Sequence, residues 1–232
     1  MNICLANINQ DQPSKRTFIG TMSSSIDASS KFQNTAVFLV DVYNEFLHPS
    51  GKIYKFVSES LATTNAIFHL DELVKTARKV QVPIYYALHQ TWKEGNYEGW
   101  QRMNATTTGF FDSRALQEGS WGARIFQGLE PDILGNKDVV VSKHWNSSGF
   151  ANTDLDYQLR QRNITHLVIA GMIANTCVES TARYARELGY HVTLLSDATA
   201  GFSNDHTNAA TELIWPIISD EVKTIQEWTS EI

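Results

Sequence analysis

The segment Val168–Ala182, VIAGMIANTCVESTA, constrains the fold of this chain more than any other stretch. It reads as an apolar strand, a tight turn and then a helix that begins with Cys177. The first N–H groups of a helix have no partner within it, and the aligned peptide dipoles place partial positive charge at that end. Such a position favours a thiolate and can bind an oxyanion, so Cys177 is predicted to be reactive rather than a buried packing residue.

Short apolar runs alternate with helical patterns along the rest of the chain. Strands are predicted near 35–40, 82–88, 139–142, 166–170, 191–195 and 222–224, and helices near 59–79, 152–161, 176–188 and 204–214. These strands are too apolar to have a solvated face, which is typical of a parallel sheet covered by helices on both sides. We therefore predict an α/β fold with three α/β/α layers around a mostly parallel, Rossmann-like sheet of about six strands.

Two polar residues follow predicted strands directly. Asp41 ends the run TAVFLVD, and Lys143 ends the run DVVVSK. Taken singly, each has an ordinary explanation, as a carboxylate that caps a turn or as a solvated lysine. Ligands bind at the carboxyl ends of strands in open α/β sheets. A carboxylate there can accept a thiol proton, and a nearby lysine keeps that carboxylate ionised and favours the thiolate. Together with Cys177, these residues predict a nucleophilic site.

Three separated blocks of the chain resemble the isochorismatase-like cysteine hydrolase superfamily, which also includes nicotinamidases and N-carbamoylsarcosine and ureidoacrylate amidohydrolases. The blocks are DVYNEF at 41–46, SKHWNSSGF at 142–150 and GMIANTCVESTARYARELGYHVTLLSDATAGFS at 171–203. The resemblance implies that Cys177 is the nucleophile, Asp41 the general base and acid, and Lys143 the positively charged third member. It also implies a cis peptide bond between Met172 and Ile173, with the N–H groups of Ile173 and Cys177 forming an oxyanion hole.

The residues expected around the substrate differ from the family pattern. Tyr43 replaces the usual glutamine and Glu45 the usual aspartate, which changes the wall of the pocket. Almost fifty residues, 89–138, separate two predicted strands and hold many aromatic residues, so this insertion is expected to cover the strand ends as a lid. The predicted substrate-binding residues are Tyr43, Phe46, Trp92 and Phe150. Alternatively, the aromatics of the insertion form a satellite core or a subunit interface.

Three functions follow from these residues, and the first is favoured because the cysteine is retained. In the first, Cys177 attacks the carbonyl of a small-molecule amide or ureide, and the thioester is then hydrolysed. In the second, Asp41 protonates the enol ether of isochorismate, which releases pyruvate and 2,3-dihydroxy-dihydrobenzoate without a sulfur nucleophile. In the third, the chain is a non-catalytic binding or redox-sensing protein in which Cys177 is oxidised.

No metal or organic cofactor is expected. Nicotinamidases of the superfamily hold a metal through an aspartate and two histidines, including a DxH group just after the second strand. Here that position reads ALHQTW, where His89 has no aspartate two residues ahead and no second histidine nearby. His144, next to Lys143, is interpreted as a hydrogen-bonded neighbour of the site rather than a ligand.

Composition limits the partners and the compartment. A net charge of −6 argues against nucleic acid or an anionic membrane as a partner, and the family resemblance implies a small-molecule substrate. The chain has no apolar run long enough for a signal peptide or a membrane span, and only two cysteines, Cys4 and Cys177, so a cytoplasmic location is predicted. Residues 1–34 are predicted to form a polar arm outside a single domain of residues 35–232. The arm and the aromatic insertion together suggest a homo-oligomer, a dimer or a tetramer.

Overall fold

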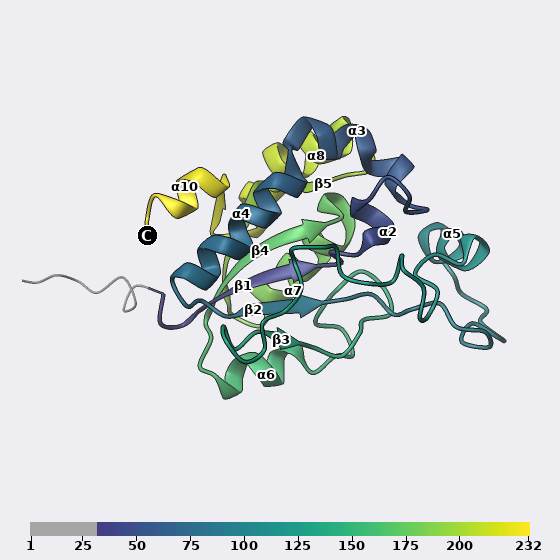
Figure 1. Ribbon diagram of the computed structural model, residues 1–232, viewed down its shortest axis with the longest axis horizontal. Coiled ribbons are helices and arrows are strands. Elements are labelled where there is room, and N and C mark those ends of the chain that lie inside the picture. Colours follow the sequence, from purple (N-terminus) through teal and green to yellow (C-terminus); the bar gives the residue numbers. More distant parts are fainter. Residues whose placement is uncertain (1–31) are drawn as a thin grey trace, which may run out of the picture.

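Figure 1 shows the computed structural model, which describes residues 32–232. Its centre is a six-stranded sheet in the order β3-β2-β1-β4-β5-β6, in which all neighbouring strands are parallel. The strands are β1 (Thr35–Val40), β2 (Ile84–Ala87), β3 (Val139–Val140), β4 (His166–Met172), β5 (His191–Ala200) and β6 (Glu221–Lys223). The predicted α/β fold with a parallel sheet of about six strands is confirmed.

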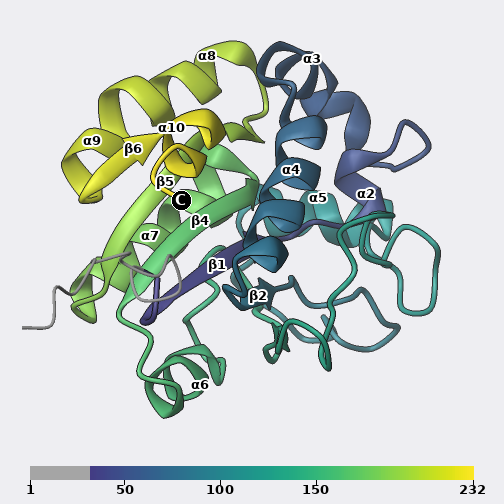
Figure 2. The same cartoon turned by 60° about the vertical axis from the view of Figure 1, so that its left-hand side comes forward.

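Helices cover both faces of the sheet (Figures 1 and 2). One face is packed against α3 (Tyr54–Thr64), α4 (Ala66–Lys79) and α10 (Ile225–Thr229). The other face is packed against α6 (Leu155–Gln161), α7 (Glu179–Glu187) and α9 (Trp215–Ile218). Successive residues of β1 point alternately into these two layers, because side chains alternate along a strand. All six residues of β1 are therefore buried, which explains its continuous apolar run.

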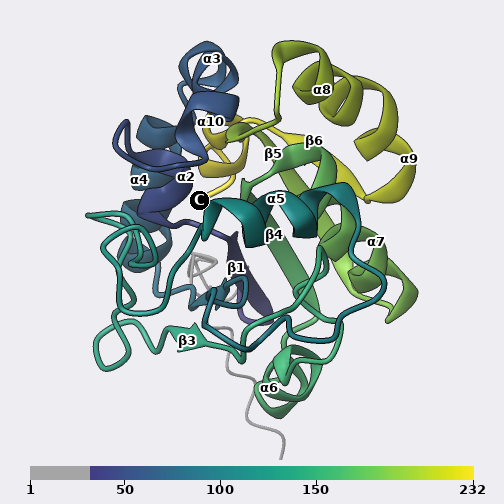
Figure 3. The ribbon, with the colours of Figure 1, turned by 90° about the vertical axis from the view of Figure 1, so that its right-hand side faces the viewer.

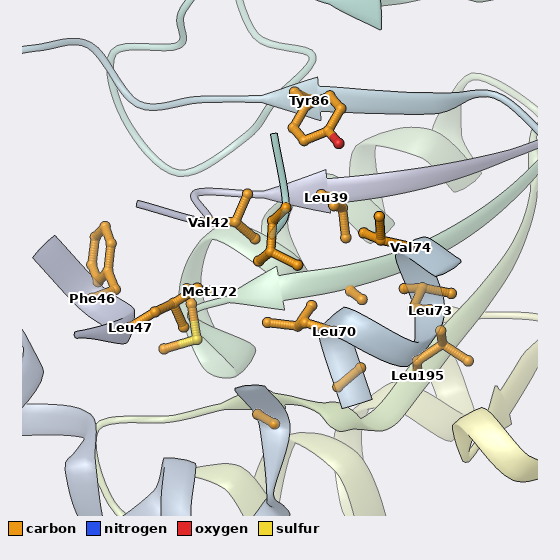
Figure 4. Close-up of a cluster of buried hydrophobic side chains, with 14 of the residues drawn as sticks. Leu39, Val42, Phe46, Leu47, Leu70, Leu73, Val74, Tyr86, Met172 and Leu195 are labelled. Carbon is orange, nitrogen blue, oxygen red and sulfur yellow. The ribbon is translucent and has the colours of Figure 1, made fainter. Parts of the chain in front are cut away.

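The larger of the two cores lies between the sheet and α4 (Figure 4). Leu70, Leu73 and Val74 of α4 face Leu39 of β1 and Leu195 of β5. Each such side chain stabilises the fold by roughly 1.5–3 kcal/mol when it is fully buried. This packing holds β1 and β4 rigidly, so the residues that follow these strands have fixed positions.

Three predicted helices are divided in the structure. The helix expected over 59–79 is two helices, because Asn65 adopts a left-handed conformation, with φ of 51°, between α3 and α4. Asparagine tolerates this conformation better than most residues. The helix expected over 176–188 begins with the π-helical turn η1 (Ala174–Val178) and continues as α7. The helix expected over 204–214 comprises α8 (Asn204–Asn208) and the π-helical segment η2 (Ala209–Ile214), and α9 follows.

The insertion over 89–138 contains one helix, α5 (Ala105–Ser113), which crosses in front of the carboxyl ends of the strands (Figure 3). Its long loops are tied to the segment around α2 (Asn44–Leu47), just after β1. The carboxylate of Glu45 accepts a hydrogen bond of 3.1 Å from the N–H of Leu116, and the amide of Asn44 donates one of 3.0 Å to the carbonyl of Trp121. Asn44 and Glu45, the polar residues of this short helix, therefore anchor the insertion.

The polar arm predicted over 1–34 lies outside the described residues, apart from 32–34. Phe32 packs edge-on against Trp228 of α10, with ring centroids 6.0 Å apart. Among the helices of residues 32–232, none is long and apolar enough to cross a bilayer.

Candidate active site

Asp41 follows β1 directly and turns its carboxylate into the space above the sheet. Its backbone has a φ of 51°, which is uncommon for a residue other than glycine. The Asp41 N–H donates to the carbonyl of Ala87 at 2.9 Å, and its own carbonyl accepts from the N–H of Tyr43 at 2.7 Å. These bonds fix the turn between the ends of β1 and β2, and the Asp41 side chain is only 1% exposed.

Cys177 lies in η1, after the turn that ends β4. The peptide bond between Met172 and Ile173 is cis. The carbonyl of Ile173 accepts hydrogen bonds from the N–H groups of Thr176 and Val178, at 3.0 and 3.2 Å, which closes the turn around the cysteine. The Cys177 residue is half-buried, and the Thr176 hydroxyl donates to its sulfur at 3.9 Å.

The thiol of Cys177 and the carboxylate of Asp41 interact, and each shifts the pKa of the other. Burial raises the pKa of Cys177 well above its ordinary value of 9.0, and the charge and hydrogen bonding of Asp41 raise it further, against smaller effects of Thr176 and the Ile173 N–H. Burial also opposes ionisation of Asp41, but the charge and hydrogen bond of His144, with smaller effects of His89 and Cys177, bring the pKa of Asp41 below 3.8. The resting pair is therefore a neutral thiol beside a carboxylate.

This result corrects the expectation that the helix terminus and Lys143 keep Cys177 as a thiolate. The sulfur is buried next to an anion, and both conditions favour the thiol.

His144 occupies the position beside Asp41 that the sequence analysis assigned to Lys143. The Nε2 atom of His144 lies 3.2 Å from Oδ1 of Asp41, and the same oxygen accepts a hydrogen bond of 2.6 Å from the N–H of His89. Oδ2 of Asp41 has no well-directed hydrogen bond within residues 32–232, which leaves this oxygen for the Cys177 thiol or a ligand. The His144 side chain is fully buried.

Lys143 makes no direct contact with the other two predicted catalytic residues. Within the described residues, no hydrogen bond or ion pair joins Lys143 to Asp41 or Cys177. Burial lowers the pKa of Lys143 against the effect of Glu118, and the charge of Lys143 in turn lowers the pKa of His89. The chain around residue 143 is extended, and neighbouring side chains of an extended segment point to opposite sides. A bridge between His89 and His144 holds His144, rather than Lys143, against Asp41.

A small enclosed cavity of about 20 Å³ lies over the thiol. Residues from six separate segments line it, namely Asp41, Phe46, His89, Thr106, Thr107, Phe110, Asn146, Ser147, Ile173, Thr176, Cys177 and Phe202. Both predicted oxyanion-hole residues are among them. Of the four predicted substrate-binding residues, only Phe46 lines this cavity.

The other three predicted substrate-binding residues lie elsewhere. The Tyr43 hydroxyl is buried behind the site and donates to the carbonyl of His89 at 2.8 Å. Trp92 lines a separate cavity, where the guanidinium of Arg114 lies 5.0 Å from its ring. Phe150 is buried in the core on the far side of the sheet, stacked on Tyr184 with ring centroids 5.7 Å apart.

Sequence reasoning missed the residues of α5 and the loop after His144. Thr106, Thr107 and Phe110 reach the cavity from α5, and the ring of Phe110 stacks on His89 at 5.0 Å. One available signal was the sequence NATT, because the side chain of Asn104 caps α5 by accepting from the N–H of Thr107. That signal marks a helix start but does not show where the helix lies.

The donor set does not fit a metal ion. Among residues 32–232, no three histidine, cysteine or acidic side chains are grouped closely enough to hold one. One ring nitrogen of His89 already interacts with the carbonyl of Gln90 at 2.8 Å.

Comparisons with known proteins agree with this fold. A ureidoacrylate amidohydrolase from Azorhizobium caulinodans is 30% identical over 211 residues, which cover 86% of this chain and 88% of that protein. A second ureidoacrylate amidohydrolase, from Methylobacterium radiotolerans, is 29% identical over 85% of this chain and 76% of that protein. The crystal structure of a cysteine hydrolase from Pseudomonas syringae pv. phaseolicola superposes with a TM-score of 0.70 at 27% identity, covering 86% of this chain and 92% of that one.

The fold and the likeness to these proteins place the chain among hydrolases built on a parallel sheet with helices on both faces. The isochorismatase domain matches residues 35–221, and the chain belongs to the isochorismatase family.

Proposed function

We propose that this protein is a cysteine hydrolase that cleaves the C–N bond of a small-molecule amide or ureide. The observation that carries the proposal is the pairing of the Cys177 thiol with the Asp41 carboxylate at the floor of one cavity. A buried acceptor beside a thiol is the arrangement that nucleophilic catalysis needs. The amidohydrolases and the cysteine hydrolase to which the chain is similar support the same class of reaction.

The reaction begins with general-base catalysis. Because the resting thiol keeps its proton, Asp41 removes this proton as the sulfur of Cys177 bonds to the substrate carbonyl carbon. The electron pair of the C=O bond moves to oxygen. The resulting oxyanion accepts hydrogen bonds from the backbone N–H groups of Ile173 and Cys177, two residues that line the cavity. Negative charge thus passes from the carboxylate to the oxyanion.

The second half of the reaction returns every group to its starting state. The C–N bond breaks as Asp41 gives its proton to the leaving nitrogen, and a thioester remains on Cys177. Asp41 then removes a proton from a water molecule, whose oxygen attacks the thioester carbon. The acid product departs and Cys177 regains its proton, so the net reaction is amide plus water to acid plus amine or ammonia.

The shape of the cavities limits the substrate. The space of about 20 Å³ over Cys177 holds little more than one water molecule, so it accepts the reacting carbonyl group alone. A second cavity of about 710 Å³ adjoins it, and Thr106, Phe110 and Phe202 line both. The body of the substrate is assigned to this larger cavity.

Charge in the larger cavity favours an anionic substrate. Lys52 and Lys55 line it, and within residues 32–232 no carboxylate lies within ion-pair distance of either amine. The Lys52 amine donates only to the carbonyls of Ser113 and Arg114. The substrate is therefore expected to carry a carboxylate or similar group at the end away from the scissile bond.

A substrate screen with matched variants tests the proposal. Amides and ureides with and without a distal carboxylate are incubated with the wild type, Cys177→Ala and Cys4→Ser, and ammonia or amine release is measured. The expected result is turnover by the wild type and Cys4→Ser and none by Cys177→Ala, with a mass increase on Cys177 when acyl-enzyme is trapped by acid quench. Pyruvate release from isochorismate that survives Cys177→Ala would contradict the proposal and favour enol ether hydrolysis.

A further inference from the structure

His144 has hydrogen-bond acceptors at both ring nitrogens. Its Nδ1 lies 2.6 Å from the carbonyl oxygen of Asn146, and its Nε2 lies 3.2 Å from Oδ1 of Asp41. The backbone holds the ring in this position, because the His144 N–H donates to the carbonyl of Leu88 and its carbonyl accepts from the N–H of Gln90. The residue is thus fixed beside the end of β2.

The number of protons follows from these two contacts. A neutral imidazole carries one N–H and one lone pair, so it satisfies one acceptor and turns a lone pair toward the other. A carbonyl oxygen has no proton to donate, and an ionised carboxylate has none either. While Asp41 is ionised, both contacts are favourable only if His144 carries a proton on each nitrogen.

We infer that His144 is a positively charged positioning residue: its imidazolium supplies the buried cation of the Asp41–Cys177 site, in place of Lys143, and makes the site dependent on the protonation of one histidine. The charge itself follows from the contacts of His144. Its part in the reaction rests on the proposed function.

The groups that face His144 are accounted for on every side. Within residues 32–232, Asp41 is the anion that forms an ion pair with it, His89 lies edge-on at 5.3 Å between ring centroids, and Asn146 offers its carbonyl. Burial lowers the pKa of His89, and His144 and Lys143 lower it further against the effect of Asp41, so His89 is neutral. Burial also opposes the charge of His144, but the charge and hydrogen bond of Asp41, helped by Asn146, raise the pKa of His144 above 6.5.

The cation acts on both proton transfers of Asp41. Without it, burial would raise the pKa of the Asp41 carboxyl, opposed only by the smaller effects of His89 and Cys177, and would favour the protonated form of the base. Beside the cation, the protonated form of Asp41 is a stronger acid, so it delivers its proton to the leaving nitrogen more readily. The working state is an ionised Asp41 with a protonated His144. This state is reached as pH rises past the lowered pKa of Asp41 and is lost as pH rises through the raised pKa of His144.

Nuclear magnetic resonance of the histidine side chains tests the charge without reference to activity. In ¹⁵N–¹H spectra of the full chain, assigned with His144→Gln and His89→Gln, both ring nitrogens of His144 should be protonated at neutral pH. Its titration midpoint should lie above 6.5 and fall below 6.5 in Asp41→Asn, because burial, the largest effect on this pKa, is then opposed only by the Asn146 carbonyl. Lys143→Ala should leave the midpoint unchanged. A single-proton tautomer of His144 at pH 6, or a midpoint that Asp41→Asn does not move, would overturn the inference.

The pH dependence of hydrolysis tests the role in the reaction, with the amide found by the screen as substrate. His144→Gln should lower kcat/KM by about tenfold at neutral pH and shift the acid limb of the pH–rate profile to higher pH. His144→Lys should restore most of the rate and shift the alkaline limb to higher pH, since a lysine keeps its proton to a higher pH than a histidine does. Equal alkaline limbs in His144→Lys and the wild type would refute the role. If no amide is turned over, the proposed function fails, and the resonance experiment still decides the charge.

Discussion

Gly171 lies where β4 passes closest to β1, one residue before the end of the strand that leads to Cys177. Its φ is 112°, and a Cβ atom placed on it would lie 2.2 Å from the carbonyl oxygen of Val40, directly before Asp41. Gly189 also has a positive φ, of 88°, but nothing lies within 4 Å of the corresponding position. Alanine substitutions at these two glycines therefore separate the cost of a positive φ from the cost of a steric overlap with the neighbouring strand.

We predict that Gly171→Ala destabilises the protein much more than Gly189→Ala does. Alanine at Gly189 should cost about 1–2 kcal/mol of unfolding free energy, the penalty of a left-handed conformation. Alanine at Gly171 adds a steric overlap with backbone that cannot move freely, so the loss should exceed about 3 kcal/mol. Urea unfolding at equilibrium measures both values. Equal losses would show that β1 and β4 can separate at the site.

The pKa of the Cys177 thiol predicts its reactivity toward alkylating agents. Because burial and Asp41 raise this pKa, little thiolate exists at neutral pH. Cys177 in a Cys4→Ser background should react with iodoacetamide more slowly than a free small-molecule thiol at pH 7, and the rate should still be rising above pH 9. Mass spectrometry follows the label. Fast alkylation at neutral pH with an acidic midpoint would instead indicate a stabilised thiolate.

At the scale of single residues, sequence reasoning placed some site positions and missed others for one physical reason. Asp41 and Cys177 each follow a buried strand, so the end of the strand fixes their place at the same edge of the sheet. Lys143 and His144 are adjacent in an extended segment, where one residue faces inward and the other outward. The apolar run before them is too short and irregular to show which, since β3 spans only Val139–Val140.

Helix α5 is the element that closes the site, and it is held weakly. None of its residues is buried, although Thr106 and Phe110 line both cavities. An element with few buried apolar contacts opens at low free energy. We therefore expect substrate to reach the space over Cys177 by displacement of α5.

We predict that Gly109→Ala strengthens α5. Gly109 lies in the middle of this helix with nothing within 4 Å of a Cβ, so alanine should stabilise the helix by about 0.5–1 kcal/mol. Hydrogen exchange of the α5 amides should slow several-fold. Gly95→Ala is the control: it has equal space but a φ of 86°, so the same substitution should not stabilise its loop. Unchanged exchange in α5 would show that this helix does not open by itself.

The elements of the sheet were predictable and those of the insertion were not. Buried parallel strands are continuous apolar runs, and all six were located to within a few residues. The insertion owes its course to single polar anchors such as Glu45 and Asn44, whose partners are distant in the sequence. For the same reason, Trp92 could not be distinguished from Phe110 as the aromatic residue that reaches the site.

At the scale of the whole molecule, two large apolar side chains of residues 32–232 are exposed next to one another on η2 and α9. Leu213 is 68% and Ile217 77% exposed, and they are one helical turn apart. We predict that the protein is a homo-oligomer and that Ile217→Asp lowers its mass in light scattering, because a charge would then be buried in the contact. Leu134→Asp is the control, since Leu134 is 94% exposed in a loop. A monomeric wild type would contradict the prediction.

The buried charges of the site also set how the stability of the whole molecule depends on pH. The pKa of Asp41 is lowered below 3.8, so its contribution is present above that value and is lost as pH falls through the lower, folded value. The pKa of His144 is raised above 6.5, so its contribution is present below 6.5 and is lost as pH rises through the higher value. Cys177, whose pKa is raised above 9.0, adds a further loss at higher pH.

We therefore predict a maximum of unfolding free energy between the folded pKa values of Asp41 and His144, and a specific change of this profile in His144→Gln. The variant should lack the decline that begins above pH 6.5, because its residue 144 does not titrate, yet it should keep the decline caused by Cys177. Its acid limb should move upward, since burial then raises the pKa of Asp41 without opposition from His144. Urea unfolding across the pH range measures these curves, with Lys143→Ala as the matched control. Parallel curves for His144→Gln and the wild type would mean that folding does not change the pKa of His144.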